Sequence, residues 1–305
     1  MPVALVTGAN GFIGRRLCTT LVARGWRVVA ITRDVVAGGD LAACEATTLA
    51  KMCEGVDVVF HLAGRAHRAD GGRDEAMRDA YRRDNVAAAL RMHEAARRAG
   101  ATTFVYTSSI KVLADVSARP LSADDVPHPQ DTYAESKLEA ERALVAQGND
   151  LPVVIVRPPL VYGPGVRGNM TSLLDWIERG LPLPLGRALA ERSLVALDNL
   201  TALLARIGER RPRACVLHVR DAEDLSVRGL VEALARALDR PVRLVPVPAP
   251  VMKLGATVLR HRATYARLFE PLRVDDAATR TLLDWSPPVA AADAITEMGA
   301  WWRNR

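Results

Sequence analysis

The chain has 305 residues, of which 49% are hydrophobic and 25% are charged, and these proportions are those of an ordinary globular protein. Its net charge of +6 comes from basic residues dispersed through helical patterns beside alanine and glutamate, so we exclude nucleic acid as a partner. No apolar run is long enough to cross a bilayer, and the chain opens directly on a strand without a leader, so we predict neither membrane insertion nor secretion.

The first predicted elements are a buried strand over residues 3 to 6 and a helix over about residues 11 to 24. Three glycines span the turn between them with the spacing G-x-x-G-x-x-G. Glycine permits a tight turn, lets the backbone touch a pyrophosphate, and brings the helix close to the strand. The helix N-terminus also offers N–H groups and a positive dipole end to phosphate. We therefore predict a dinucleotide site with contacts from Gly8, Asn10, Gly11, Phe12, Ile13 and Gly14.

The second strand is predicted over residues 26 to 32. In NAD-binding folds a carboxylate at the end of this strand usually binds the adenosine ribose, but here Thr32 and Arg33 take that place. An arginine can accept a 2′-phosphate, so NADP(H) is slightly favoured over NAD(H), although Arg33 also fits a plain surface residue. Asp40 is assigned either to the adenine amino group or to capping of the next helix, and Leu41 beside it is assigned to the cofactor.

A third strand over residues 56 to 62 and a fourth over residues 102 to 107 are separated by a polar loop and a long helix, residues 74 to 99. Ligands of doubly wound sheets bind at the carboxyl ends of the strands, where small residues let a cofactor lie across. Ser108 and Ser109 follow the fourth strand directly. Further cofactor contacts are assigned to Leu62, Ala63, Gly64, Asn85 and Thr107.

An irregular loop with three prolines is predicted over residues 115 to 132, followed by a long helix over residues 132 to 148. The next strand, residues 152 to 156, ends in a proline break, where Pro158 is assigned to the cofactor. The regular alternation then decays into a helix over about residues 170 to 179, a strand near Leu194, a helix over residues 198 to 208 and a strand over residues 215 to 219.

This order of elements predicts an α/β fold: a Rossmann-type doubly wound parallel sheet with a smaller, interleaved C-terminal substrate domain. We assign residues 1–159 to an NAD(P)-binding domain, with return segments near residues 190–220. Residues 160–305 are assigned mainly to the substrate-binding cap.

The residue types that indicate chemistry lie in the helix over residues 132 to 148. Tyr133 and Lys137 are four residues apart and therefore share one face. A phenol with a reference pKa of about 10 is a poor base, but a neighbouring ammonium favours the phenolate and can also hold the nicotinamide ribose. Ser109 offers a hydroxyl to the substrate oxygen. A lone Y-x-x-x-K is usually an exposed pair, but here it follows a glycine turn and a Ser-Ser strand end, so we predict hydride transfer.

With these motifs the chain resembles the extended short-chain dehydrogenase/reductases, specifically the nucleotide-sugar epimerase/dehydratase family. The resemblance runs nearly from end to end. It rests on TGANGFIG (7–14), GDL (39–41), DVVFHLAG (57–64), TSSIKV (107–112), YAESK (133–137) and RPPLVYGPG (157–165).

The resemblance implies hydride exchange between NAD(P) and a UDP- or dTDP-sugar, usually at C4. It assigns the catalytic roles to Ser109, Tyr133 and Lys137, with Ser108 as a lesser candidate for the hydroxyl that contacts substrate. Asn169 and Arg192 match positions that usually contact the nucleotide diphosphate, although Arg192 also fits one more dispersed arginine.

One departure from the family pattern concerns the sugar 4,6-dehydratases, which carry an Asp-Glu pair after the catalytic hydroxyl residue. Here Ile110 and Lys111 stand in those places, so dehydration is not expected. Lys111 is predicted to place a positive charge near the sugar or the diphosphate. The alternative is that its side chain points to solvent.

The SSIKV form resembles a bacterial polysaccharide branch that reduces UDP-4-keto-6-deoxy-N-acetylhexosamines, and a 4-ketoreductase is our first hypothesis. A UDP-hexose or UDP-N-acetylhexosamine 4-epimerase with the same residues is the alternative. A steroid- or flavonoid-type carbonyl reductase and a non-catalytic Rossmann sensor are less favoured, because Asn169 and Arg192 argue against the former and Tyr133 and Lys137 against the latter.

The resemblance also suggests a homodimer formed through the helices over residues 74 to 99 and 132 to 148. The four cysteines show neither metal-ligand spacing nor a paired framework. We therefore expect no metal site, free thiols and a reducing, cytoplasmic location.

Overall fold

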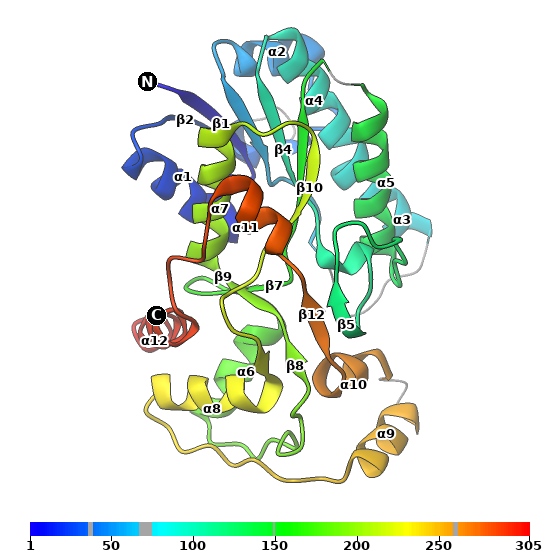
Figure 1. Cartoon of the computed structure of the whole chain (residues 1–305), viewed down its shortest axis with the longest axis vertical. Helices are drawn as coiled ribbons and strands as arrows, with labels where there is room; N and C mark the ends of the chain where they lie inside the picture. The colour runs from blue at the N-terminus through cyan, green and yellow to red at the C-terminus, as the bar shows by residue number, and fades with distance from the viewer. Residues whose placement is uncertain (36–38, 67–74, 149, 259–261) are drawn as a thin grey trace.

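The computed structural model describes the whole chain except residues 36–38, 67–74, 149 and 259–261. Most of the predicted polar loop after the third strand, and the first residue of the helix predicted to follow it, lie outside the described residues. Figure 1 shows the sheet with its helices in the upper half of the molecule and a smaller group of helices and short strands below it.

The main sheet has six strands, and every neighbouring pair in it is parallel. The order across the sheet is β10 (Cys215–His218), β6 (Val153–Arg157), β4 (Thr103–Thr107), β3 (Val58–His61), β1 (Val3–Thr7) and β2 (Arg27–Ile31). The chain runs from β1 outward to β2 and then returns to β3 on the other side of β1. This change of direction is where doubly wound sheets bind ligands, and the predicted Rossmann-type fold is confirmed.

The sheet is buried on both faces because its strands are continuous apolar runs, as the fully buried VALVT of β1 illustrates. One face packs against α2 (Ala46–Cys53), α4 (Ala88–Arg98) and α5 (Thr132–Ala146). The other face packs against α1 (Phe12–Ala23), α7 (Leu197–Arg210) and α11 (Ala277–Leu283), as Figure 1 shows.

The helix predicted over residues 74 to 99 is not uniform. It begins as α3 (Glu75–Tyr81), widens into a π-helical segment, η3 (Arg82–Ala87), and continues as α4. Such widened turns are rare and often occur at functional sites, and this one contains Asn85. The sequence predicted one long helix here, and it did not indicate that these six residues form a wider turn.

The lower part of the molecule is built on two small sheets and a third hydrophobic core. One sheet pairs β7 (Leu160–Tyr162) with β9 (Leu194–Ala196), and the other has the order β11 (Leu225–Ser226), β8 (Glu191–Arg192), β12 (Leu272–Val274) and β5 (Ser117–Leu121). The helices here are α6 (Asn169–Glu178), α8 (Val227–Ala237), α9 (Ala249–Val258), α10 (Arg262–Phe269) and α12 (Ala291–Arg303).

Strand β5 corrects the prediction that residues 115 to 132 are irregular throughout. β5 pairs in parallel with β12, which lies about 150 residues further along the chain. The partner is remote, the strand is short, and Pro120 lies within it, so the local sequence gives no alternation that indicates a strand.

The chain leaves the main sheet after β6 and re-enters it with β10, which pairs with β6 residue by residue. Helix α7, just before β10, packs on the same core as α1. The division of the chain into two domains at residue 159 stays a prediction.

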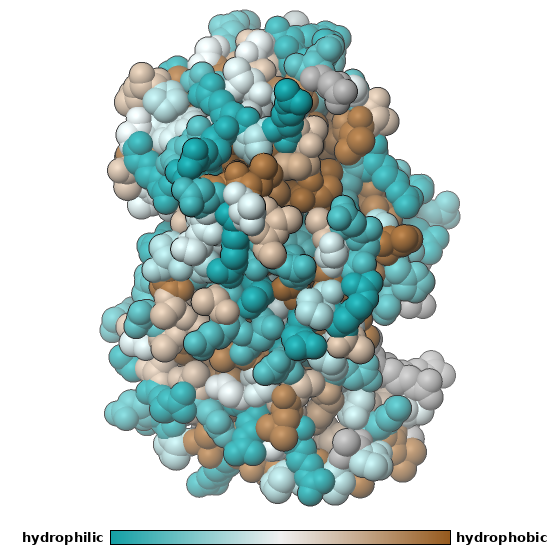
Figure 2. All heavy atoms as spheres, in the orientation of Figure 1, coloured by the Kyte–Doolittle hydropathy of each residue, from teal (hydrophilic) through white to brown (hydrophobic). Residues whose placement is uncertain are grey.

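On the face that Figure 2 shows, hydrophilic and hydrophobic side chains are interspersed. None of the helices in the described ranges combines the length and the apolar character needed to cross a bilayer.

Helix α5 is joined to β6 by a buried ion pair. Both guanidinium contacts of Arg157 with Glu141 are short, at 3.0 and 2.7 Å, and the two side chains are only 6% and 4% exposed. On the same helix, Glu139 forms an exposed pair with Arg82, whose side chain is 64% exposed. The same kind of interaction therefore occurs in two very different environments.

We predict that Glu141→Gln lowers the free energy of unfolding by about 3 kcal/mol, because it leaves the Arg157 charge buried and uncompensated. The matched variant Glu232→Gln, in the exposed ion pair that Glu232 forms with Arg228 on α8, should change it by less than about 0.5 kcal/mol, since an exposed pair contributes little. Urea denaturation of both variants measures the difference. Equal losses in the two would contradict this account of how α5 is anchored.

Candidate active site

The turn between β1 and α1 is closed by contacts between backbone atoms. Gly8 has φ +68°, and its carbonyl oxygen accepts a hydrogen bond from the N–H of Gly11 at 2.9 Å. A Cβ at Gly14 would lie 2.2 Å from that same oxygen, so no side chain fits there. The N-cap of α1 is Gly11, which provides no side-chain cap, so the first N–H groups of the helix remain available to a ligand. This cradle fits the pyrophosphate of a dinucleotide.

The other residues predicted around this turn have different surroundings. Phe12 packs toward the lower core and Ile13 toward the sheet core, while the carbonyl of Asn10 accepts from Arg15 at 2.9 Å. Next to the turn lies the end of β3: the hydroxyl of Thr7 accepts from the N–H of Ala63 at 3.1 Å. Leu62 and Ala63 therefore lie against Gly8 and, with Gly64 after them, form the floor beside the glycine turn, and their contact with the cofactor stays a prediction.

Asn85 is fully buried and its side chain is engaged on both sides. Its Oδ1 accepts from the N–H of Arg65 at 2.7 Å, and its Nδ2 donates to the hydroxyl of Ser136 at 2.9 Å. A Cβ at Gly64 would lie 2.7 Å from Asn85 Oδ1. Asn85 thus joins the loop after β3 to helix α5. Sequence reasoning did not single out Ser136, whose position beside Lys137 was the only available signal.

The three predicted catalytic residues converge at the carboxyl end of β4. Asp131 caps α5 by accepting from the N–H of Ala134 at 2.8 Å, which fixes the start of the helix that carries Tyr133 and Lys137. The side chains of Ser109 and Tyr133 are hydrogen-bonded. The ammonium of Lys137 is buried and donates to the carbonyl of Thr107 at 2.9 Å.

The pKa values of these groups differ from the sequence-based expectation. The phenol of Tyr133 is densely surrounded, and this desolvation raises its pKa to about 12, against the opposing effect of the Ser109 hydrogen bond. Asp131 and Tyr81 raise the pKa of Tyr133 further. The prediction that Lys137 brings this pKa down is wrong, because desolvation dominates. Burial lowers the pKa of Lys137 itself to about 8.

At neutral pH these values leave a neutral phenol beside a hydroxyl group and an ammonium. A neutral phenol can donate a proton to an oxygen on which negative charge develops. The arrangement therefore supports protonation of a reacting oxygen, with the proton held at Tyr133 Oη.

The predicted substrate contacts are distributed around this centre. Ser108 is buried and its hydroxyl has no hydrogen-bond partner within the described ranges. Asn169 opens helix α6 and is exposed. Arg192 donates to the backbone carbonyls of Glu270 at 2.7 Å and Asp115 at 3.0 Å, and burial lowers its pKa to about 10. These two contacts span two loops of the lower part of the molecule.

The residues predicted for the adenosine end lie near β2. Arg33 is exposed in the one-turn helix η1 (Arg33–Val35), directly after Thr32. The carboxylate of Asp40 accepts from the N–H of Ala42 at 2.8 Å and lies 3.4 Å from Arg83. The capping alternative for Asp40 is wrong, since the N-cap of α2 is Glu45. Leu41 packs against the sheet core, and the carbonyl of Pro158 accepts from Ile110 at 3.0 Å.

Comparison with known proteins gives a consistent result. The model of the NAD dependent epimerase/dehydratase family matches residues 4–214. The chain is 35% identical to the UDP-glucose 4-epimerase of Vibrio cholerae, over 93% of this chain and 90% of that protein. It is 32% identical to the UDP-2-acetamido-2,6-beta-L-arabino-hexul-4-ose reductase of Pseudomonas aeruginosa, over 75% of this chain and 56% of that protein.

A solved structure with a similar fold is UDP-glucuronic acid 4-epimerase from Bacillus cereus in complex with NAD. Its TM-score is 0.80 with 21% sequence identity, and the match covers 99% of each chain. At this level of sequence identity the similarity establishes the fold alone.

We predict that Gly14→Ala weakens binding of NAD(P)H by more than about tenfold. The added Cβ would clash with the Gly8 carbonyl oxygen and would push α1 away from the turn. Gly255→Ala is the matched control, since nothing lies within 4 Å of a Cβ there. Titration of cofactor fluorescence measures both variants. Wild-type affinity in Gly14→Ala would contradict the assignment of the glycine turn to the pyrophosphate.

Proposed function

The chain belongs to the NAD dependent epimerase/dehydratase family, and from this premise we propose that it reduces the C4 keto group of a UDP-4-keto-(6-deoxy)-N-acetylhexosamine during polysaccharide precursor synthesis. The relatives of this chain include both a nucleotide-sugar epimerase and nucleotide-sugar reductases. The finer assignment to a reductase is our proposal.

The observation that carries the proposal is the convergence of Ser109, Tyr133 and Lys137, in which the Tyr133 phenol is hydrogen-bonded to Ser109 and desolvation raises its pKa to about 12. A reductase needs only an acid at this place, whereas an epimerase also needs a base to start the oxidation. The name of the Pseudomonas aeruginosa relative, a 4-ketohexose reductase, supports the same reading.

In the proposed reaction the bound reduced nicotinamide supplies the hydride that reaches C4 of the sugar. Tyr133 Oη donates a proton to O4, and the Ser109 hydroxyl keeps the phenol directed at that oxygen. Lys137, held by the Thr107 carbonyl, keeps a positive charge next to the reacting groups. The buried hydroxyl of Ser108 and the side chains of Asn169 and Arg192 are proposed to contact the nucleotide sugar.

The 4-epimerase is the second candidate, since the Vibrio cholerae relative carries that name and matches the chain over 93% of its length.

Solved structures with this fold also differ in the nicotinamide cofactor that they hold. Among solved structures with this fold, one holds NAD and another holds NADPH. We propose a slight preference for NADP(H), supported by the exposed Arg33 at the end of β2.

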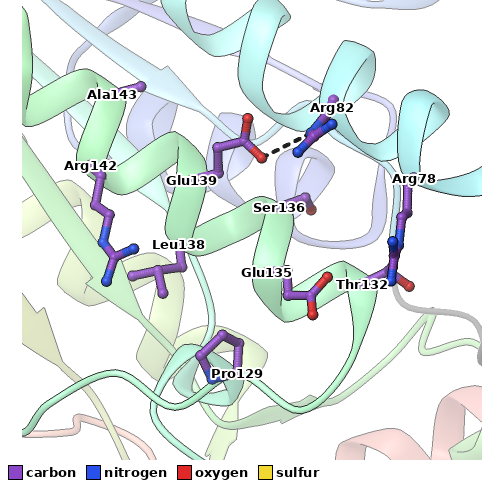
Figure 3. A pocket seen from close by; sticks show the side chains of 10 residues that line it. All are labelled: Arg78, Arg82, Pro129, Thr132, Glu135, Ser136, Leu138, Glu139, Arg142 and Ala143. Atoms are coloured by element: carbon purple, nitrogen blue, oxygen red, sulfur yellow. Dashed lines mark hydrogen bonds and ion pairs between the residues drawn. The ribbon is translucent and has the colours of Figure 1, made fainter. Parts of the chain in front are cut away.

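The outer face of α5 carries a groove of about 750 Å³ between this helix and the segment α3–η3. Figure 3 shows Glu139 on α5 paired with Arg82 across it, and Glu135 and Arg78 are among the other residues that line it. Charges of both signs on one face suit a self-complementary contact. A homodimer through this face is therefore proposed, and light scattering would test it.

We also propose a cytoplasmic location. The four cysteines, all of them among the described residues, are free thiols, as a reducing compartment keeps them.

The test of the proposed function uses two substrates. With a UDP-4-keto-6-deoxy-N-acetylhexosamine, consumption of reduced cofactor in step with product is expected. Tightly retained NAD together with turnover of UDP-hexose, and none of the ketosugar, would defeat the reductase. Tyr133→Phe should lower turnover by about 10²–10⁴-fold and leave cofactor binding unchanged, because only the proton donor is removed. A fully active Tyr133→Phe would contradict the role of the phenol.

The pH dependence of the reduction follows from the two shifted groups. Lys137 has its pKa lowered to about 8, so its ammonium is present below that pH and is lost above it. Tyr133 remains protonated throughout, since its pKa is about 12. We therefore predict that kcat/KM for the ketosugar is level at neutral pH and falls as pH rises through about 8. A rate that rises between pH 7 and 9 would instead identify a phenolate as the active form.

A further inference from the structure

Lys111 lies between the catalytic hydroxyl and the catalytic helix. It is the middle residue of η4 (Ile110–Val112), the single turn that begins directly after Ser109. Its ammonium is ion-paired with Asp131, and it lies 3.4 Å from Asp115. The side chains of Lys111, Asp131 and Asp115 are only 17%, 20% and 13% exposed. A largely buried cation that faces two carboxylates is already neutralised, so it is not available to a diphosphate.

Asp131 serves the catalytic helix in two ways. One carboxylate oxygen caps α5 through the N–H of Ala134, while the other pairs with Lys111. Its negative charge also raises the pKa of Tyr133, which follows two residues later. If the carboxylate were unpaired, it would be a largely buried charge beside the proton donor.

The backbone at Lys111 completes the connection. Its N–H donates to the hydroxyl of Ser109 at 3.3 Å, and the side chain of Ser109 is in turn hydrogen-bonded to Tyr133. One residue therefore contacts the catalytic hydroxyl through its backbone and the start of the catalytic helix through its side chain.

We infer that Lys111 is a positioning residue, which ties the Ser109 turn to the N-terminus of α5 and neutralises Asp131 beside Tyr133. The catalytic part of this inference rests on the proposed function of Ser109 and Tyr133. It takes the place of the predicted contact between Lys111 and the sugar or diphosphate.

The experiment uses the full-length enzyme and four variants. Lys111→Met removes the charge, and Lys111→Arg keeps it. Lys111→Met combined with Asp131→Asn removes both charges, while asparagine still caps the helix. Lys51→Met is the matched control, because Lys51 is exposed on α2 and takes part in none of the contacts that the described residues make at the site.

In the ketosugar reduction, Lys111→Met should lower kcat by about tenfold or more while KM for the nucleotide sugar stays within about twofold. Lys111→Arg and the double variant should recover most of the loss, and Lys51→Met should match the wild type. A raised KM with unchanged kcat, or no recovery in the double variant, would overturn the inference in favour of a substrate contact or a general packing role.

A second measurement does not depend on turnover. Hydrogen exchange of the Ala134 amide should be faster in Lys111→Met than in Lys111→Arg or Lys51→Met, because the cap has lost its ion-pair partner. Unchanged exchange overturns the positioning role whatever the substrate proves to be. A wild type inactive on both sugars, or a fully active Tyr133→Phe, would refute the proposed function separately.

Discussion

The carbonyl oxygen of Gly8 sets the geometry on which the rest of this structure depends. It leaves no space for a side chain at Gly14, so α1 lies directly against the end of β1. The turn then contacts the backbone of Ala63 as well, which brings the ends of β1 and β3 together. The uncapped start of α1 and the floor after β3 thus meet at the reversal of strand order, where an extended dinucleotide can lie.

Helix α5, which carries the proposed catalytic residues, is held to this frame at several separate places. Lys137 reaches the carbonyl of Thr107 on β4, Glu141 pairs with Arg157 on β6, and Ser136 bonds to Asn85. These contacts use polar or charged groups that are largely withdrawn from water, so losing one partner leaves another unsatisfied. These contacts hold α5 in one position relative to the sheet, as the proposed role of Tyr133 as proton donor requires.

The sequence predicts those features that depend on neighbouring residues. Apolar runs indicate the parallel strands, and the glycine spacing indicates the turn at Gly8, because both patterns are local. Features that depend on remote partners were missed. Strand β5 pairs with residues near position 272, and Arg192 bonds to the carbonyl of Glu270. The pKa of Tyr133 was predicted in the wrong direction, since its solvation depends on groups from several elements that only the folded chain brings together.

The return of the chain to the sheet through β10 has a consequence for how the molecule is made. The edge strand next to β6 is synthesised about 60 residues after it. While ribosomes elongate the intervening segment, β6 remains an open edge of the nascent sheet, exposed to pairing with other chains. This edge is covered only when Cys215–His218 is available to pair with β6, so the six-stranded sheet is completed late in synthesis.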